Sequence, residues 1–266
     1  MYKTVKRAFK NNSHNLLFKI IADFGRAFNK LYENSNHDIS CNGEIMVLKK
    51  LAKISAPIII DGGANVGKYA LLVHKYNTTS KIYALEPVDS TFEKLKENTQ
   101  HIKNIIPINK GLFSENCSKE INIFSSDTHS SIYDIDGYST KEKNVKTIDL
   151  VAGDYFLSEH KIEQVDFLKI DVEGAEYDAL LGFKESIKQG SIKAVQFEYG
   201  YINITTKKLL IDFYHFFEAH DYVIGKIFPK RVEFREYKYK YEDFLGPNFI
   251  AVKKSETELI KVLSNK

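Results

Sequence analysis

A short apolar strand followed directly by a glycine-rich loop constrains this chain most. Residues 58–60 are three consecutive isoleucines, as expected of a strand buried on both faces of a parallel sheet. The loop at 61–67 reads DGGANVG and precedes a predicted helix at 68–76. Glycines let the backbone turn sharply and approach a ligand, and a helix start offers free N–H groups. The segment therefore predicts a ligand site at the first strand–helix turn of an α/β domain.

Strand and helix patterns alternate downstream of this turn. Six further strands are predicted, at 81–86, 104–109, 165–170, 192–197, 222–227 and 248–252. Extra strands are expected within 112–150, and one aromatic-rich helix at 205–220. Because parallel strands are joined by right-handed crossovers, this order predicts a doubly wound, Rossmann-like sheet of about seven mostly parallel strands with helices on both faces.

The sheet domain is predicted at 56–254, between a helical extension at 1–55 and a tail at 255–266. The extension contains apolar residues at helical spacing, namely Leu17, Ile20, Ile21, Phe24, Phe28 and Leu31. Basic residues precede them: Lys3, Lys6, Arg7 and Lys10. A cap on the core or a homodimer contact is the simpler interpretation of the extension. Peripheral contact with an anionic membrane is the alternative.

Charge and cysteine content exclude several classes of protein. Lys and Arg number 38 against 35 Asp and Glu, a balance too even to indicate a nucleic-acid-binding protein. The two cysteines, Cys41 and Cys117, are too far apart for a zinc pattern and fit a reducing compartment. No apolar run reaches the roughly 20 residues of a membrane span, and the basic N-terminus lacks the apolar core of a signal peptide. We therefore expect a cytoplasmic location.

Two nucleotide-binding patterns almost match the glycine loop. Residues 62–68 fit the Walker pattern, but Tyr69 replaces the Ser or Thr that holds magnesium. Residues 62–67 read G-x-A-x-x-G, with Ala64 at the position where a dinucleotide pyrophosphate approaches the backbone. Both matches are imperfect, and a tight turn without any ligand is a further alternative.

Asp61 favours a third ligand, S-adenosylmethionine. A carboxylate at this strand end can engage the ammonium of a bound methionine group, whereas it would repel a pyrophosphate. The residues of this segment predicted to bind the cofactor are Asp61, Gly62, Gly63, Ala64, Asn65 and Gly67.

An acid at the end of the second strand indicates an adenosine ribose. Glu86 can accept hydrogen bonds from both ribose hydroxyls. NAD and S-adenosylmethionine both carry this ribose, so Glu86 does not distinguish them. Further adenosine contacts are expected from Asn109 and Gly111 after the third strand, and from Asp127 in a polar loop.

The fourth strand, which reads DFLKIDVEGAE, brings ionisable residues to the same edge of the sheet. Methyl transfer to oxygen requires the protein to position a hydroxyl and take its proton. The candidates are Asp171, Lys169 and Glu173, together with Glu198 at the end of the fifth strand. Asp171 is also expected beside the cofactor. Asp171 and Glu198 could instead hold a divalent ion such as Mg²⁺, and an internal salt bridge that braces the sheet is the non-catalytic interpretation.

Four segments resemble the FkbM family of methyltransferases. They read IIIDGGANVGKYALL, IYALEP, VKTIDL and DFLKIDVEGAEYDALLGF, and the resemblance covers roughly residues 58–252. It implies a class I methyltransferase fold with strand order 3-2-1-4-5-7-6, S-adenosylmethionine as cofactor, and O-methylation, often of sugars, glycans or polyketide products. Gly63 departs from the family, which commonly has a bulkier residue there. Residues 1–55 lie outside the resemblance.

Three functions follow as hypotheses. The favoured one is an S-adenosylmethionine-dependent O-methyltransferase that acts on a hydroxyl of a sugar or glycan. An NAD-dependent sugar oxidoreductase is the second, although no Tyr-x-x-x-Lys is usefully placed after the fourth strand. A non-catalytic cofactor-binding scaffold is the third.

Overall fold

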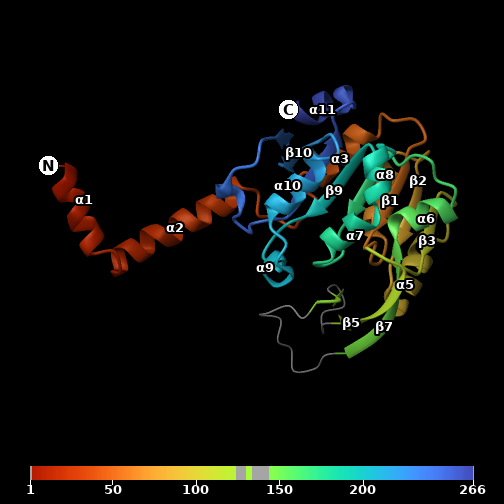
Figure 1. Cartoon of the computed structure of the whole chain (residues 1–266), viewed down its shortest axis with the longest axis horizontal. Helices are drawn as coiled ribbons and strands as arrows, with labels where there is room; N and C mark the ends of the chain where they lie inside the picture. Colours follow the sequence, from red (N-terminus) through yellow and green to blue (C-terminus); the bar gives the residue numbers. More distant parts are fainter. Residues whose placement is uncertain (1, 124–129, 134–143, 266) are drawn as a thin grey trace.

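An eight-stranded sheet forms the centre of the molecule (Figure 1). The structure is a computed structural model that describes residues 2–123, 130–133 and 144–265. The strand order is β11-β10-β12-β9-β8-β1-β2-β3. These strands are β1 (Ile58–Gly62), β2 (Lys81–Leu85), β3 (Ile105–Ile108), β8 (Phe167–Ile170), β9 (Ala194–Glu198), β10 (Tyr222–Ile227), β11 (Val232–Phe234) and β12 (Asn248–Lys253).

The predicted class I order is confirmed, with one edge strand added. Strands β3, β2, β1, β8 and β9 run parallel, and β12, β10 and β11 follow antiparallel. This reproduces 3-2-1-4-5-7-6, and β11 extends it by three residues that the sequence pattern does not predict. Because β1 and β8 are neighbours in parallel register, their carboxyl ends meet at one edge of the sheet.

Helices cover both faces of the sheet, and each layer closes an apolar core. One core includes buried residues of α6 (Gly153–Glu159), α7 (Glu176–Gly182), α8 (Lys184–Gln189) and α10 (Leu210–Glu218). The other includes residues of α3 (Glu44–Leu51), α4 (Lys68–Tyr76), α5 (Asp89–Thr99) and α11 (Thr257–Ser264). Leu263 of α11 is fully buried, so the last helix belongs to the packed body.

A second, four-stranded sheet lies in the segment where extra strands were expected. Its order is β4-β7-β5-β6, formed by β4 (Gly111–Phe113), β5 (Cys117–Ile123), β6 (Ser130–Ser131) and β7 (Asn144–Ala152). Its inner side chains form a third apolar cluster with Val88 and Ala175, next to the ends of β2 and β8. This sheet therefore forms a wall beside the ligand-binding edge of the main sheet.

The single helix predicted at 205–220 is wrong. The chain forms α9 (Ile202–Thr206) and then α10, because Lys207 adopts a left-handed conformation with φ of 55° and ends the first helix. Leu209 is extended, and its N–H donates to the Asp212 carboxylate at 2.8 Å, which starts the second helix. A short 3₁₀ helix (Tyr239–Tyr241) lies between β11 and β12.

The first two helices, α1 (Tyr2–Asn11) and α2 (Leu16–Tyr32), extend away from the body as an arm (Figure 1). The chain returns to the body immediately after α2. There the Asn34 side chain donates to the carbonyls of Asn42 and Ile227, at 2.7 and 2.9 Å. Within the described residues, no helix combines the length and apolar character needed to span a bilayer.

Candidate active site

The glycine loop after β1 folds tightly against the ends of two neighbouring strands. The N–H groups of Gly63 and Ala64 both donate to the Leu85 carbonyl, at 3.1 and 2.9 Å. Gly63 has a φ of 80°, and a Cβ atom there would lie 1.7 Å from the Asp171 carbonyl oxygen. A bulkier residue at this position would therefore require the backbone after β8 to move. Gly67, also left-handed, is the N-cap of α4.

A buried lysine joins two carboxylates at the ends of β1 and β8. Asp61 lies opposite Lys169 in the strand register. The Lys169 Nζ atom is 2.7 Å from Oδ2 of Asp171 and 3.7 Å from Oδ1 of Asp61. Asp61 is fully buried, and neither of its oxygens has a hydrogen-bond partner in the described part of the chain. Asp61 is therefore a buried acceptor whose oxygens are unsatisfied among the described residues, an arrangement that calls for an explanation.

The charges of this triad follow from burial and proximity. Burial raises the pKa of Asp61 to about 6, and Lys169 limits the rise. Burial by itself would lower the pKa of Lys169, but the carboxylates of Asp171 and Asp61 outweigh it, so this pKa is raised. Lys169 therefore remains an ammonium ion at neutral pH. It fits the role of a cation that positions carboxylates and does not fit that of a proton acceptor.

Glu86 is held rigidly just beyond the end of β2. Its Oε2 accepts from the Asn65 N–H and its Oε1 from the Val88 N–H, both at 3.0 Å. Burial raises the pKa of Glu86 to about 7, although both backbone hydrogen bonds oppose the rise. A carboxylate oxygen has two acceptor positions, so each oxygen keeps one for a ligand hydroxyl.

One cavity lies between these strand ends and the second sheet. Five of the residues predicted to bind cofactor line it: Gly63, Asn65, Glu86, Gly111 and Asp171. Four others are not among its lining residues: Asp61, Gly62, Ala64 and Gly67. Its apolar wall comprises Val88, Leu112, Ile121, Ile132, Ile148 and Leu150. Polar groups at one end and an apolar wall at the other suit a nucleoside.

Two predicted adenosine contacts have a different outcome. Asn109 is not among the residues that line this cavity, and its side-chain amide donates to Asp89 at 2.7 Å on the surface. Asp127 lies outside the residues that the structure describes.

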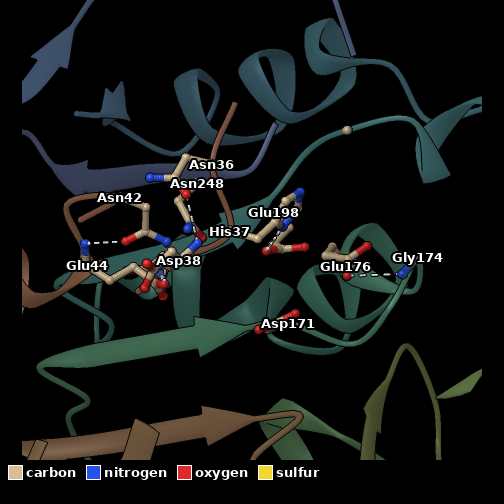
Figure 2. Close-up of polar contacts among 12 residues, drawn as sticks. Asn36, His37, Asp38, Asn42, Glu44, Asp171, Gly174, Glu176, Glu198 and Asn248 are labelled. Carbon is tan, nitrogen blue, oxygen red and sulfur yellow. Dashed lines mark hydrogen bonds and ion pairs between the residues drawn. The ribbon is translucent and has the colours of Figure 1, made fainter. Parts of the chain in front are cut away.

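A second cavity adjoins the first, and Asp171 and Glu173 line both. Glu198 at the end of β9 lines the second cavity, and Figure 2 shows its side chain near that of His37. The remaining lining comes from three segments: Ser35–Glu44, Tyr199–Ile202 and Phe244–Pro247. The structure thus brings all four predicted catalytic residues to one region, with Lys169 beneath it and three carboxyls around it.

The carboxyls at this junction raise one another's proton affinity. Burial, followed by the charges of Asp171 and Glu176, raises the pKa of Glu173 to about 8. Burial and the same neighbouring acids raise the pKa of Glu198 well above its ordinary value. Glu173 also has a φ of 53°, an uncommon conformation for a residue with a side chain. The junction therefore holds a carboxyl that exchanges its proton near neutral pH and attracts positive charge.

Sequence reasoning missed two residues of this region. Glu176 is buried, and its Oε1 accepts from the N–H groups of Val172 and Gly174, each at 3.1 Å. It belongs to the quoted DVEGAE motif and could have been found there. His37 lies in the extension, with Nδ1 3.9 Å from Oε1 of Glu198, and no local pattern marks it.

A buried polar network holds the His37 segment in place. The Asn42 amide donates to Glu44 Oε2 at 2.8 Å, and the Gln196 amide donates to Glu44 Oε1 at 2.8 Å. Gln196 also donates to Asn248 at 3.2 Å. Figure 2 shows Asn42, Glu44 and Asn248 on one side of Glu198, with Glu176 and Gly174 on the other. The extension is therefore tied to β9 by the hydrogen bond between Glu44 and Gln196, and Gln196 is in turn bonded to β12.

The suggested metal pair is incomplete within the described part of the chain. No group of three or more His, Cys, Asp or Glu residues there has an arrangement that could hold a metal ion. Asp171 and Glu198 therefore lack a third ligand from those residues.

Comparisons with known proteins agree with this geometry. A family model described as "Methyltransferase FkbM domain" matches residues 61–241. Hexuronic acid methyltransferase AglP of Haloferax volcanii is 25% identical over 157 residues, which are 58% of this chain and 61% of the relative. Methyltransferase 1 of Beauveria bassiana is 26% identical over 145 residues, 48% of this chain and 58% of the relative. The chain thus spans about 60% of the length of these relatives.

Solved structures resemble the chain only distantly. Fibrillarin from Aeropyrum pernix, in complex with natively bound S-adenosyl-L-methionine, is 14% identical, with a TM-score of 0.41 over 79% of this chain and 73% of that one. A likeness of this size indicates nothing about a ligand. The family model, in contrast, covers more than half of the chain, and the chain therefore belongs to the FkbM methyltransferase family.

Proposed function

We propose that this protein is an S-adenosylmethionine-dependent O-methyltransferase that acts on a hydroxyl of a sugar or glycan. The observation that carries the proposal is the pair of adjoining cavities that share Asp171 and Glu173. A methyltransferase needs two ligand sites that meet at the transferred methyl group. The printed name of the relative AglP, a hexuronic acid methyltransferase, supports a sugar as acceptor.

Residues of the first cavity, and the buried Asp61 next to the lining residue Gly63 through Gly62, fit the methyl donor. Asp61 offers a buried carboxylate without a hydrogen-bond partner in the described residues, which suits an ammonium group. Gly63 lets the turn pack closely against the Asp171 backbone, and Glu86 presents two fixed oxygens that suit ribose hydroxyls. When bound, S-adenosylmethionine supplies an electrophilic methyl group on a positively charged sulfur.

We assign proton acceptance to Glu173. It lines both cavities, and its pKa of about 8 allows it to take a proton near neutral pH. Lys169 fixes Asp171 beside it through the 2.7 Å ion pair. Glu198, whose pKa is raised well above its ordinary value by burial and the neighbouring acids, lines the second cavity and can contact the acceptor there. With the cofactor bound, Glu173 would take the proton of the acceptor hydroxyl as that oxygen is methylated.

Transfer of a labelled methyl group tests this function. The panel of acceptors comprises free hexuronic acids, neutral sugars, nucleotide sugars and glycans, each assayed with EDTA and with added Mg²⁺. We expect label in a uronic acid or a glycan that contains one, with a methyl ether in the product's NMR spectrum. A methyl ester or N-methyl product would contradict O-methylation of a hydroxyl. Loss of transfer with EDTA that Mg²⁺ restores would add a metal to the site.

Variants separate an enzyme from a scaffold. Glu173→Gln keeps the shape of the side chain and removes the proton acceptor. We expect it to retain S-adenosylhomocysteine binding and to lose methyl transfer. A scaffold would retain its function in this variant, so an unchanged activity would contradict the proposed role.

A further inference from the structure

The arm formed by α1 and α2 leaves a continuous apolar surface uncovered. No residue of α2 is buried. The exposed apolar side chains are Leu16, Leu17, Ile20, Ile21, Phe24, Phe28 and Leu31, of which Phe28 is 67% exposed and Leu31 78%. An apolar face of this extent marks a surface that contacts a partner or a membrane.

The charged residues of α2 lie on the opposite face of the helix. Lys19, Asp23, Arg26 and Lys30 follow one another at spacings of four, three and four residues. At about 100° per residue, this spacing gathers them into one stripe, and the apolar residues form a second stripe across the helix. Segregation of this kind is typical of a helix that lies in the plane of a membrane interface.

The positive charge of the protein is concentrated on this arm. Residues 1–32 contain seven Lys and Arg against one Asp, whereas the rest of the chain contains 31 Lys and Arg against 34 Asp and Glu. The net charge of +3 is therefore the sum of a positively charged arm and a negatively charged body. Two copies of this arm packed together would bring like charges close, whereas an anionic lipid surface attracts them.

The two helices of the arm are joined by ring and cap contacts. The rings of Phe9 and Phe18 lie 5.4 Å apart between centroids. The Asn15 side chain caps α2 by accepting from the Phe18 N–H at 3.0 Å, and its amide donates to the Asn12 carbonyl, directly after α1, at 2.6 Å. Lys10 and Arg7 on α1 are exposed. These contacts join basic α1 to amphipathic α2, so both can reach one lipid surface.

We propose that the arm docks this protein on the surface of an anionic membrane, with the apolar face of α2 in the lipid interface. The base of the arm adjoins the second cavity. Glu33, the first residue after α2, pairs with Lys226 of β10 at 3.3 Å, and Ser35 and His37 line that cavity. Docking therefore places Ser35 and His37, which line the candidate acceptor site, a few residues from the lipid-bound helix.

Vesicle co-sedimentation of the full chain tests the proposal. The vesicles contain phosphatidylcholine alone or with phosphatidylglycerol, at low and high salt. We expect binding to the anionic vesicles that is at least about tenfold stronger than to the neutral ones and that weakens with salt. Equal binding to both vesicles, or none to either, would overturn the proposal.

Two double variants with the same change in charge isolate the apolar face. Phe24→Asp with Phe28→Asp alters the apolar stripe, whereas Ala22→Asp with Asn29→Asp places the same two charges elsewhere on α2. We expect the first pair to lose at least about tenfold more vesicle affinity than the second. Because all four residues are exposed, the melting temperature should stay unchanged in both.

The second copy of the chain is the competing occupant. If light scattering shows a dimer that only the Phe24→Asp, Phe28→Asp variant converts to monomer, and vesicles bind neither protein, the face is a dimer interface. That result would overturn membrane docking.

Discussion

Glu173 lies where the two cavities meet, and its backbone conformation and proton affinity both depart from the ordinary. A φ of 53° holds its side chain at the junction. Burial and the charges of Asp171 and Glu176 raise its pKa to about 8, and Lys169 opposes them only in part. A residue with this combination has the features of a proton acceptor that works near neutral pH.

The pH profile of kcat/KM reports this group. A base acts only when it is deprotonated, so we expect kcat/KM to rise with pH and level off above about 8. Glu173→Gln should lower kcat by about 10²-fold to 10⁴-fold and remove this rise. His37→Asn is the control, because His37 also lines the acceptor cavity. If the rise of kcat/KM with pH disappears in His37→Asn but persists in Glu173→Gln, His37 and not Glu173 is the proton acceptor.

Substitution of Glu86 gives a second prediction for a single residue. Glu86→Gln keeps the length of the side chain but replaces one acceptor oxygen by a donor, which disturbs either a backbone contact or a ribose contact. We expect S-adenosylhomocysteine affinity to fall by about tenfold, because that is the typical effect of losing one good hydrogen bond to a charged group. Titration calorimetry measures the change, with Asp89→Asn as the surface control. Unchanged affinity would exclude Glu86 from the cofactor site.

At the scale of elements, the pairing of β1 with β8 buries a carboxylate, Asp61, that is assigned to the cofactor. Its ionisation lowers the stability of the fold. The register of the two strands places Asp61 opposite Lys169 in a fully buried position. The pKa of Asp61 is about 6 in the folded chain, against an ordinary value of 3.8. The folded chain thus holds this proton more tightly than the unfolded chain does. The free energy of unfolding therefore falls as pH rises between these two values, by up to about 3 kcal/mol.

Asp61→Asn should separate the two effects. The variant removes a buried charge whose ionisation destabilises the fold, so we expect a higher melting temperature at pH 7 and little change at pH 4. It also removes the carboxylate assigned to the cofactor's ammonium, so S-adenosylhomocysteine should bind at least about tenfold more weakly. Thermal unfolding at both pH values, with and without S-adenosylhomocysteine, measures both quantities. A variant that is less stable at pH 7 would show that Lys169 needs both carboxylates.

The same elements show what the sequence can predict. β1, β2 and β8 are mostly apolar runs with acids at their ends, so the position of Asp61, Glu86 and Asp171 at strand ends follows from local pattern. The pairing of β1 with β8 is instead implied by the resemblance to the family. β11 has three residues, too few for a periodic pattern. The break at Lys207 depends on a left-handed residue that no glycine or proline marks. His37 reaches the site through contacts between Glu44 and Gln196, which are 152 residues apart, so local reasoning could not place it.

At the scale of the whole molecule, three parts meet around one junction. The carboxyl edge of the main sheet supplies Glu86 to the first cavity and Glu198 to the second, and the second sheet supplies the apolar wall of the first cavity. The extension closes the second cavity with Ser35 and His37 and continues outward into the arm (Figure 1). The arm and the segment that lines the second cavity are thus consecutive in the chain. Under the proposed docking, the acceptor cavity would therefore lie close to the membrane.

A crystal structure of the protein with S-adenosylhomocysteine tests the central claim most directly. We predict the adenine against Ile121, Ile148 and Leu150, the ribose hydroxyls on Glu86, and the sulfur directed toward Asp171 and Glu173. The second cavity should remain open on the other side of that sulfur. A ligand bound elsewhere, or one whose sulfur lies away from the shared wall of the two cavities, would contradict the assignment.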